Sequence, residues 1–254
     1  MRVAGAGYIP LSQGVTRVVI VMLGALGIGW SCLTLPTFLN EYPIGQFAAR
    51  IQRGDSFPAE RLQEQLSRFR AGIHLTDCSA SAAHSSAVVD FTSVRADADS
   101  LDAQIEAARR SVVTGLSCVP SDGYLWFALF QVESLQSGLR EEYISHLAMS
   151  YKVNPNEAWL AIPRNRAAFA IYPALSNDLK SKVLDEFCQL VRTGLYWNAI
   201  DIFLGSAQPY QDALVKHMEK LPVRDRQLFA VALARKGVDA RIPGTSVVVR
   251  DWLH

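Results

Sequence analysis

The feature that most constrains this sequence is an uncharged stretch near its start, at residues 18–39, VVIVMLGALGIGWSCLTLPTFL. As a helix it is about 33 Å long, enough to cross the hydrocarbon core of a bilayer. The apolar core of a cleaved signal peptide is shorter, about 7–15 residues, and no small-residue cleavage motif follows this stretch. A lipoprotein signal needs small residues before its cysteine, whereas the bulky Trp30 precedes Cys32 closely. We therefore predict a membrane-spanning helix rather than a signal peptide or a buried core helix.

The flanking charges give the helix a direction. Arg2, Arg17 and the terminal amine make the arm at residues 1–17 positive, which favours a cytoplasmic N-terminus. The predicted location is the bacterial inner membrane, with the large domain in the periplasm. Within the span, Ala25 and Gly29 lie four residues apart on one helix face and would let a partner helix approach closely. Glycine is also common in membrane helices without a specific partner, so both interpretations stay open.

The rest of the chain is predicted to be helical. Residues 40–96 are expected to form a linker, with short amphipathic helices at 43–53 and 58–70 and a polar loop at 72–96 that holds a short strand at 87–91. Residues 97–254 are expected to form the helical domain, with helices beginning at Ser121 and Asn154 and an interruption at Pro163. A β-branched tail at 246–252 is expected to pair as a strand or to pack on the last helix.

Three tryptophans suggest a repeat within this domain. Trp126, Trp159 and Trp197 follow one another at intervals of 33 and 38 residues. Tetratricopeptide units repeat every 34 residues or so, with an aromatic residue early in the first helix. Two all-α architectures therefore stay open: a tetratricopeptide-like array of helical hairpins, or a helical bundle without repeats, in which three tryptophans in the core have this spacing by chance.

The charge balance and the motifs exclude several classes of function. The net charge is only +1, with no basic stripe, so no nucleic-acid partner is predicted. No nucleotide-binding, dinucleotide-binding or serine-hydrolase motif is present. His74, Cys78 and His84 resemble a set of zinc ligands but lack a fourth at a familiar spacing. We therefore predict no metal, no cofactor and no catalytic residue, and we expect the remaining histidines and carboxylates to be structural or solvated.

The cysteines fit an exported domain. Cys78 and Cys118 flank the helix predicted at residues 97–116, and they are expected to form a disulfide if the domain lies in an oxidising compartment. The alternative is two free thiols in a reducing one. Cys188 is expected to be a buried thiol, because apolar residues surround it within a helix.

One further pair of residues suggests a contact surface. Arg164 and Arg166 flank Asn165 just after Pro163. They could form an anion-contacting edge on the concave face of a helical array. The alternative is an ordinary helix start with solvated arginines.

A block at residues 120–175 carries a resemblance to a known family. Its features are the Pro-x-Asp-Gly-x-x-Trp helix start at Pro120, the Asn154-Pro155 pair and the helix at residues 164–172. In these the chain resembles bacterial membrane-anchored, tetratricopeptide-like proteins associated with cell-surface polysaccharide biosynthesis. The resemblance implies an accessory or scaffolding role, with a membrane-protein partner and glycan contact, and supplies no catalytic residues. A structural or assembly subunit of another membrane complex, and an envelope enzyme acting on glycans, remain the alternatives.

Overall fold

The computed structural model describes residues 13–72, 78–94, 101–155, 157–238 and 240–246. Over these residues the fold is all-α, as predicted, and contains no strand. The helices are α1 (Gln13–Gln52), α2 (Ala59–Gly72), α3 (Ala80–Ser93), α4 (Leu101–Cys118), α5 (Gly123–Ser137), α6 (Glu141–Val153), α7 (Ala158–Ala170), α8 (Asn177–Arg192), α9 (Tyr196–Leu204), α10 (Gln211–His217) and α11 (Val223–Arg235). Short 3-10 turns stand at Tyr172–Ala174, Gln208–Tyr210 and Met218–Lys220.

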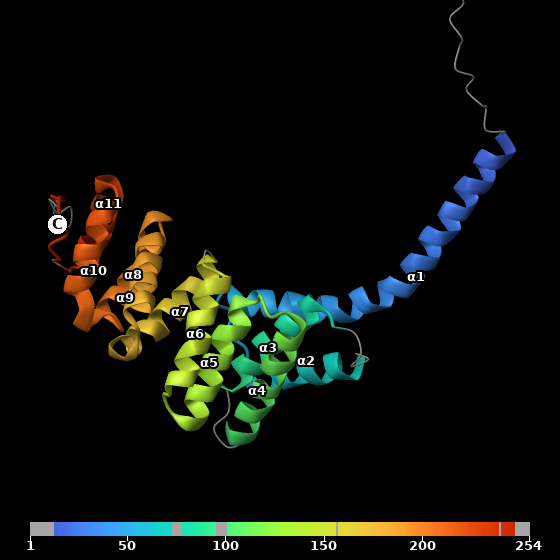
Figure 1. Ribbon diagram of the computed structural model, residues 1–254, viewed down its shortest axis with the longest axis horizontal. Helices are drawn as coiled ribbons and strands as arrows, with labels where there is room; N and C mark the ends of the chain where they lie inside the picture. The colour runs from blue at the N-terminus through green and yellow to red at the C-terminus, as the bar shows by residue number, and fades with distance from the viewer. Residues whose placement is uncertain (1–12, 73–77, 95–100, 156, 239, 247–254) are drawn as a thin grey trace, which may run out of the picture.

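Helix α1 is a single helix of 40 residues with two different halves. Its first half contains the candidate membrane span, Val15–Pro36, none of which is buried inside the protein. Its second half buries Ile44, Phe47 and Ala48 in the domain core. Figure 1 shows α1 projecting from the domain and bending along its length. The helix contains two prolines, Pro36 and Pro43, and proline is a common cause of such bends.

The prediction of a separate helix at residues 43–53 is therefore wrong. An internal proline removes one backbone hydrogen bond and normally kinks or breaks a helix. Here the helix bends but continues, and packing of its second half against α2 and α3 explains why. The separate helix predicted at residues 58–70 is confirmed as α2.

The predicted polar loop with a strand at residues 87–91 is also wrong, because this segment lies within helix α3. Ser79 caps α3 by accepting a hydrogen bond from the backbone N–H of Ala82 at 3.3 Å. The helix buries mainly small side chains, among them Ala87, Val88 and Val89, against α1, α4 and α5. Its serine-rich composition concealed this buried face.

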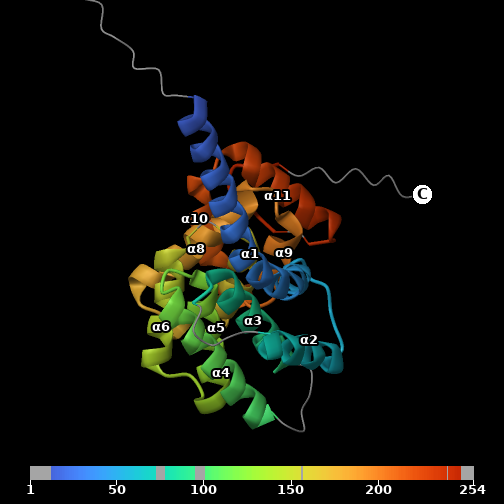
Figure 2. The same cartoon turned by 90° about the vertical axis from the view of Figure 1, so that its right-hand side faces the viewer.

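The helices from α3 to α6 pack side by side in chain order, and α8 contacts α7, α9, α10 and α11 (Figures 1 and 2). One hydrophobic core runs from Ile44 to Ile242. Residues assigned to a linker by the sequence analysis thus contribute to the same core as the later helices. In the second half of the molecule the core is aromatic: the rings of Phe187, Phe203 and Phe229 lie 5.8–6.4 Å apart.

Several predicted boundaries within the domain need correction. Asp122, not Ser121, caps α5 through hydrogen bonds from the N–H groups of Tyr124 and Leu125. Helix α7 begins at Ala158 rather than at Asn154, and it continues through Pro163. The β-branched tail is predicted to pair as a strand or to pack on the last helix, but residues 247–252 lie outside the described residues.

The three tryptophans lie near the starts of alternate helices, α5, α7 and α9. Their surroundings differ, however. Trp126 and Trp159 are half-buried, whereas Trp197 is 53% exposed and lies near Lys236. The expectation that all three belong to the core is therefore wrong. The tetratricopeptide-like repeat itself stays a prediction.

Candidate functional site

The largest fully buried side chain among the described residues is a charged one, Arg164 of α7. Its Nη1 donates to the backbone carbonyl of Ser150 at 2.8 Å, and its Nη2 donates to the carbonyl of Asn154 at 3.0 Å. Its Nε donates to Oε1 of Glu186 at 3.0 Å, and Nη2 bonds the same oxygen. The guanidinium thus ties the end of α6 to α8. The expectation that Arg164 is a solvated or anion-contacting surface residue is wrong, whereas Arg166 is exposed.

Tyr151 and Asn165 add hydrogen bonds to this buried cluster, in which Asn165 Oδ1 is left without a partner among the described residues. The Tyr151 hydroxyl donates to Oε2 of Glu186 at 2.7 Å, and Asn165 Nδ2 donates to the carbonyl of Val183 at 2.8 Å. Burial raises the pKa of Glu186, while the Arg164 charge and the hydrogen-bond donors around the carboxylate oppose that rise. Burial also raises the pKa of Tyr151 well above 10, so its phenol stays a neutral donor. The cluster is closed to solvent, and its two charged groups bond each other, as expected of a structural core.

A second polar cluster joins α1, α3 and α5. His84 Nδ1 lies 2.6 Å from Oδ2 of Asp122, and His84 Nε2 lies 2.8 Å from Nε2 of Gln52. The Tyr124 ring lies 5.3 Å from His84, and the ring of Trp159, from α7, lies 5.8 Å away. Burial of Asp122 by itself raises its pKa. The hydrogen bond and charge of His84, with the two backbone N–H groups that Asp122 caps, hold the pKa below its usual value.

The predicted disulfide is present near this cluster. Cys78 and Cys118 are bonded, with Cα atoms 5.5 Å apart, and they join the start of α3 to the end of α4. The neighbouring Ser79 donates to Oε2 of Glu41 in α1 at 2.8 Å. Together with Gln52 and His84, this contact fastens the second half of α1 to α3 at two points.

A third polar cluster joins α4, α5 and α6. Glu133 of α5 is 8% exposed, and its Oε1 lies 3.3 Å from Nε of Arg109 in α4. Its Oε2 lies 3.1 Å from Nδ1 of His146 in α6, but neither atom makes a hydrogen bond of acceptable geometry. The His146 ring is flanked by Trp126 at 5.7 Å and Tyr143 at 6.4 Å. A buried carboxylate beside an imidazole is an arrangement that general acid–base catalysis uses.

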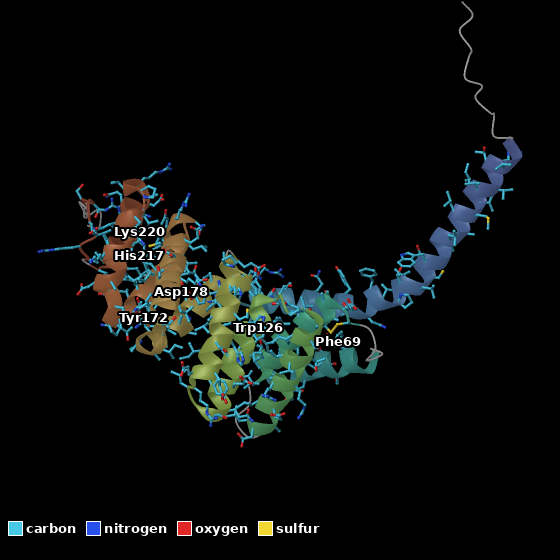
Figure 3. All side chains as sticks on the ribbon, viewed as in Figure 1. Phe69, Trp126, Tyr172, Asp178, His217 and Lys220 are labelled. Carbon is cyan, nitrogen blue, oxygen red and sulfur yellow. A yellow bond between two sulfur atoms is a disulfide. The ribbon has the colours of Figure 1, made fainter. Side chains whose placement is uncertain are left out.

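A fourth cluster lies at the far end of the molecule, where Figure 3 labels His217 and Lys220. His217 Nε2 lies 2.6 Å from Oδ1 of Asp185, and Lys220 Nζ lies 3.3 Å from the same ring nitrogen.

Cys188 is buried, as expected, and burial raises its pKa to about 12, which keeps the thiol protonated and unreactive at neutral pH.

The remaining residues singled out in the sequence are placed as follows. Ala25 and Gly29 are exposed on α1, and no other part of the described chain lies within 4 Å of the position that a Gly29 Cβ would occupy. A partner helix on this face stays a prediction. His74 lies outside the described residues, Cys78 is in the disulfide, and His84 bonds Asp122. Among the residues that the structure describes, no three His, Cys, Asp or Glu side chains group as metal ligands.

Comparison of this chain with protein-family models, with curated proteins and with solved structures finds no match.

Proposed function

We propose that this protein is a bitopic inner-membrane protein that works as a scaffold, with a cytoplasmic N-terminus and a helical domain in the periplasm. The observation that carries the proposal is the construction of α1. One uninterrupted helix contains both the exposed apolar segment Val15–Pro36 and the buried residues Ile44, Phe47 and Ala48. The domain is therefore joined to the span by continuous helix rather than by a loop, as suits a protein that holds partners at the membrane.

The disulfide supports the location. Disulfides persist in the periplasm and are rare in the reducing cytosol. Cys78 is exposed, so a reducing compartment would have access to the bond. The charge arrangement around α1 is consistent with this orientation, because Arg17 lies at the N-terminal end of the span.

The polar clusters support a scaffold more than an enzyme. Arg164 and Glu186 use their charged groups to hold helices together, and so do His84 and Asp122. We propose that the scaffold serves the biosynthesis or export of a cell-envelope polysaccharide, on the strength of the sequence resemblance of residues 120–175. The membrane-protein partner and the glycan contact belong to this proposal. A subunit of another membrane complex would use the same anchor and helical surface.

A second candidate function is an envelope enzyme that acts on glycans, and one observation favours it. Glu133 Oε2 and His146 Nδ1 face each other at 3.1 Å without a well-formed hydrogen bond, beside Trp126. If the protein is an enzyme, these two side chains are the first candidates for acid–base catalysis.

The experiment compares function with protein abundance in the bacterium. Glu133→Gln and His146→Gln are tested for surface polysaccharide, and membrane-bound protein is quantified for each after carbonate washing. For a scaffold we expect polysaccharide to follow abundance in both variants, because no single polar group is indispensable. A variant that is abundant but inactive by orders of magnitude would establish the enzyme instead. Release of the wild-type protein by carbonate would contradict the anchor, and unchanged polysaccharide on deletion of the gene would contradict the polysaccharide role.

A further inference from the structure

The second half of α1 has an exposed face that no function above uses. Its buried residues, Ile44, Phe47 and Ala48, point into the domain. The opposite face carries the exposed side chains Tyr42, Gln46 and Arg50 at helical spacing, and exposed Arg53 follows one residue after the helix ends. We call these four residues the α1 stripe. It combines an aromatic residue that is 67% exposed with two guanidinium groups.

The bend in α1 decides where the α1 stripe faces. In Figures 1 and 2, α2, α3 and α4 lie on one side of the second half of α1, and the first half rises on the other side. A bilayer that surrounds the first half would therefore lie over the uncovered side of the second half. Because the buried residues point toward the helices below, the α1 stripe faces the bilayer.

The distance from the end of the span to Tyr42 is consistent with a position near the bilayer surface. The candidate span ends at Pro36, and Tyr42 follows six residues later, about 9 Å along the axis at about 1.5 Å per residue. The headgroup layer is about 5–8 Å thick on each side of the hydrocarbon core. Tyr42 thus lies at the outer edge of the headgroup layer, and tyrosine is enriched at the membrane–water interface. Beyond Tyr42 the helix no longer follows the direction of its first half, because it has bent (Figure 1).

The arginine side chains of the α1 stripe indicate what kind of ligand it binds. Arg50 bonds Asp55 through Nε, at 2.8 Å, and its guanidinium lies 4.9 Å from the Phe57 ring centroid. Glu41, the acidic side chain nearest to Tyr42 in the chain, is turned toward the domain, where it accepts a hydrogen bond from Ser79. Guanidinium groups pair well with phosphate oxygens. We propose that the α1 stripe lies on the bilayer surface and binds the phosphate groups of anionic phospholipids. The inference rests on the membrane anchoring proposed above.

The test uses full-length protein in vesicles, with a fluorophore on single introduced cysteines in a Cys32→Ser background. The disulfide is left intact, and Cys188 is buried with its thiol protonated, so the introduced cysteine is the one that reacts. Gln46→Cys reports on the α1 stripe. Gln189→Cys, an exposed position on α8, is the control, and Leu26→Cys reports on insertion. The vesicles contain phosphatidylcholine with or without phosphatidylglycerol, and nitroxides on lipid headgroups or acyl chains act as quenchers.

We expect headgroup nitroxides to quench the probe at position 46 and not the probe at 189. This quenching should weaken without phosphatidylglycerol or at high salt. Arg50→Gln combined with Arg53→Gln should remove most of it. The matched control, Arg192→Gln with Arg235→Gln, removes the same charge elsewhere and should change nothing.

Two results would overturn the inference. In the first, position 46 is quenched no more than position 189. In the second, quenching at position 46 is indifferent to both the arginine substitutions and the anionic lipid. The probe at position 26 separates these failures from failure of the anchor, because acyl-chain nitroxides must quench it if α1 spans the bilayer.

Discussion

At the scale of single residues, Arg164 is the clearest case of a charge used for structure. It is completely buried, and its partners lie on α6 and α8. We expect Arg164→Ala to lower the free energy of unfolding by about 3–5 kcal/mol, because it leaves Glu186 buried without its counter-charge. Urea denaturation measures the effect. Arg166→Ala, two positions along and exposed, is the control and should stay within about 0.5 kcal/mol of wild type. Equal stability of the two variants would contradict the structural role.

Asp122 makes a pH-dependent contribution at the same scale. Its usual pKa is 3.8, and in the folded protein the pKa is lowered. A carboxyl group with a lowered pKa stabilises the folded state above its usual pKa, and this contribution is lost as the pH falls through the folded value. Asn at this position can still cap α5 but cannot carry the charge. We therefore expect the stability difference between wild type and Asp122→Asn to be full at pH 6 and to shrink below about pH 4. Urea midpoints across this range measure it, and a difference independent of pH would contradict the assignment.

At the scale of elements, the disulfide fixes the start of α3 against the end of α4. The two cysteines are 40 residues apart in sequence. In the chain-entropy model, a loop of this length gives a stabilisation of about 4 kcal/mol. We expect Cys78→Ser combined with Cys118→Ser to lose about this much stability in urea denaturation. Cys32→Ser is the matched control, because Cys32 is exposed in the apolar half of α1 and should be neutral. A double variant as stable as the control would show that other contacts already hold α3 and α4 together.

At the scale of the whole molecule, α1 is more than an anchor, because its second half is part of the domain core, and we expect its complete removal to destabilise the domain. A fragment that begins at residue 37 keeps Ile44, Phe47 and Ala48, whereas one that begins at residue 53 loses all three from the core. Burying side chains of this kind contributes about 1.5–3 kcal/mol for each large one. We expect the longer fragment to be soluble and to unfold cooperatively, and the shorter one to aggregate or to bind hydrophobic dyes. Circular dichroism and thermal unfolding compare them. Cooperative unfolding of both fragments would show that the second half of α1 is dispensable.

The sequence by itself determined the helical class and the apolar segment, and it made Cys78 and Cys118 the expected pair without deciding between a disulfide and two free thiols. Each depends on information that is local or compositional: an uncharged run long enough to span a bilayer, apolar residues at helical spacing, and two cysteines on either side of one predicted helix. The same local rules failed where packing opposed them. Pro43 lies inside α1, and the serine-rich segment after Ser79 is helical, because buried neighbours on other helices offset the local preference.

Only the tertiary structure decided what the charged residues do. Nothing near Arg164 in the sequence shows that it is buried, because its carboxylate partner, Glu186, lies 22 residues later on another helix. The same is true of His84 with Asp122 and of Glu133 with His146, pairs that come together only when helices pack. The direction of the α1 stripe likewise depends on a bend and on which side the domain covers. A charge is identified as structural, catalytic or lipid-facing by its neighbours in space, and these are set by the packing of helices far apart in the chain.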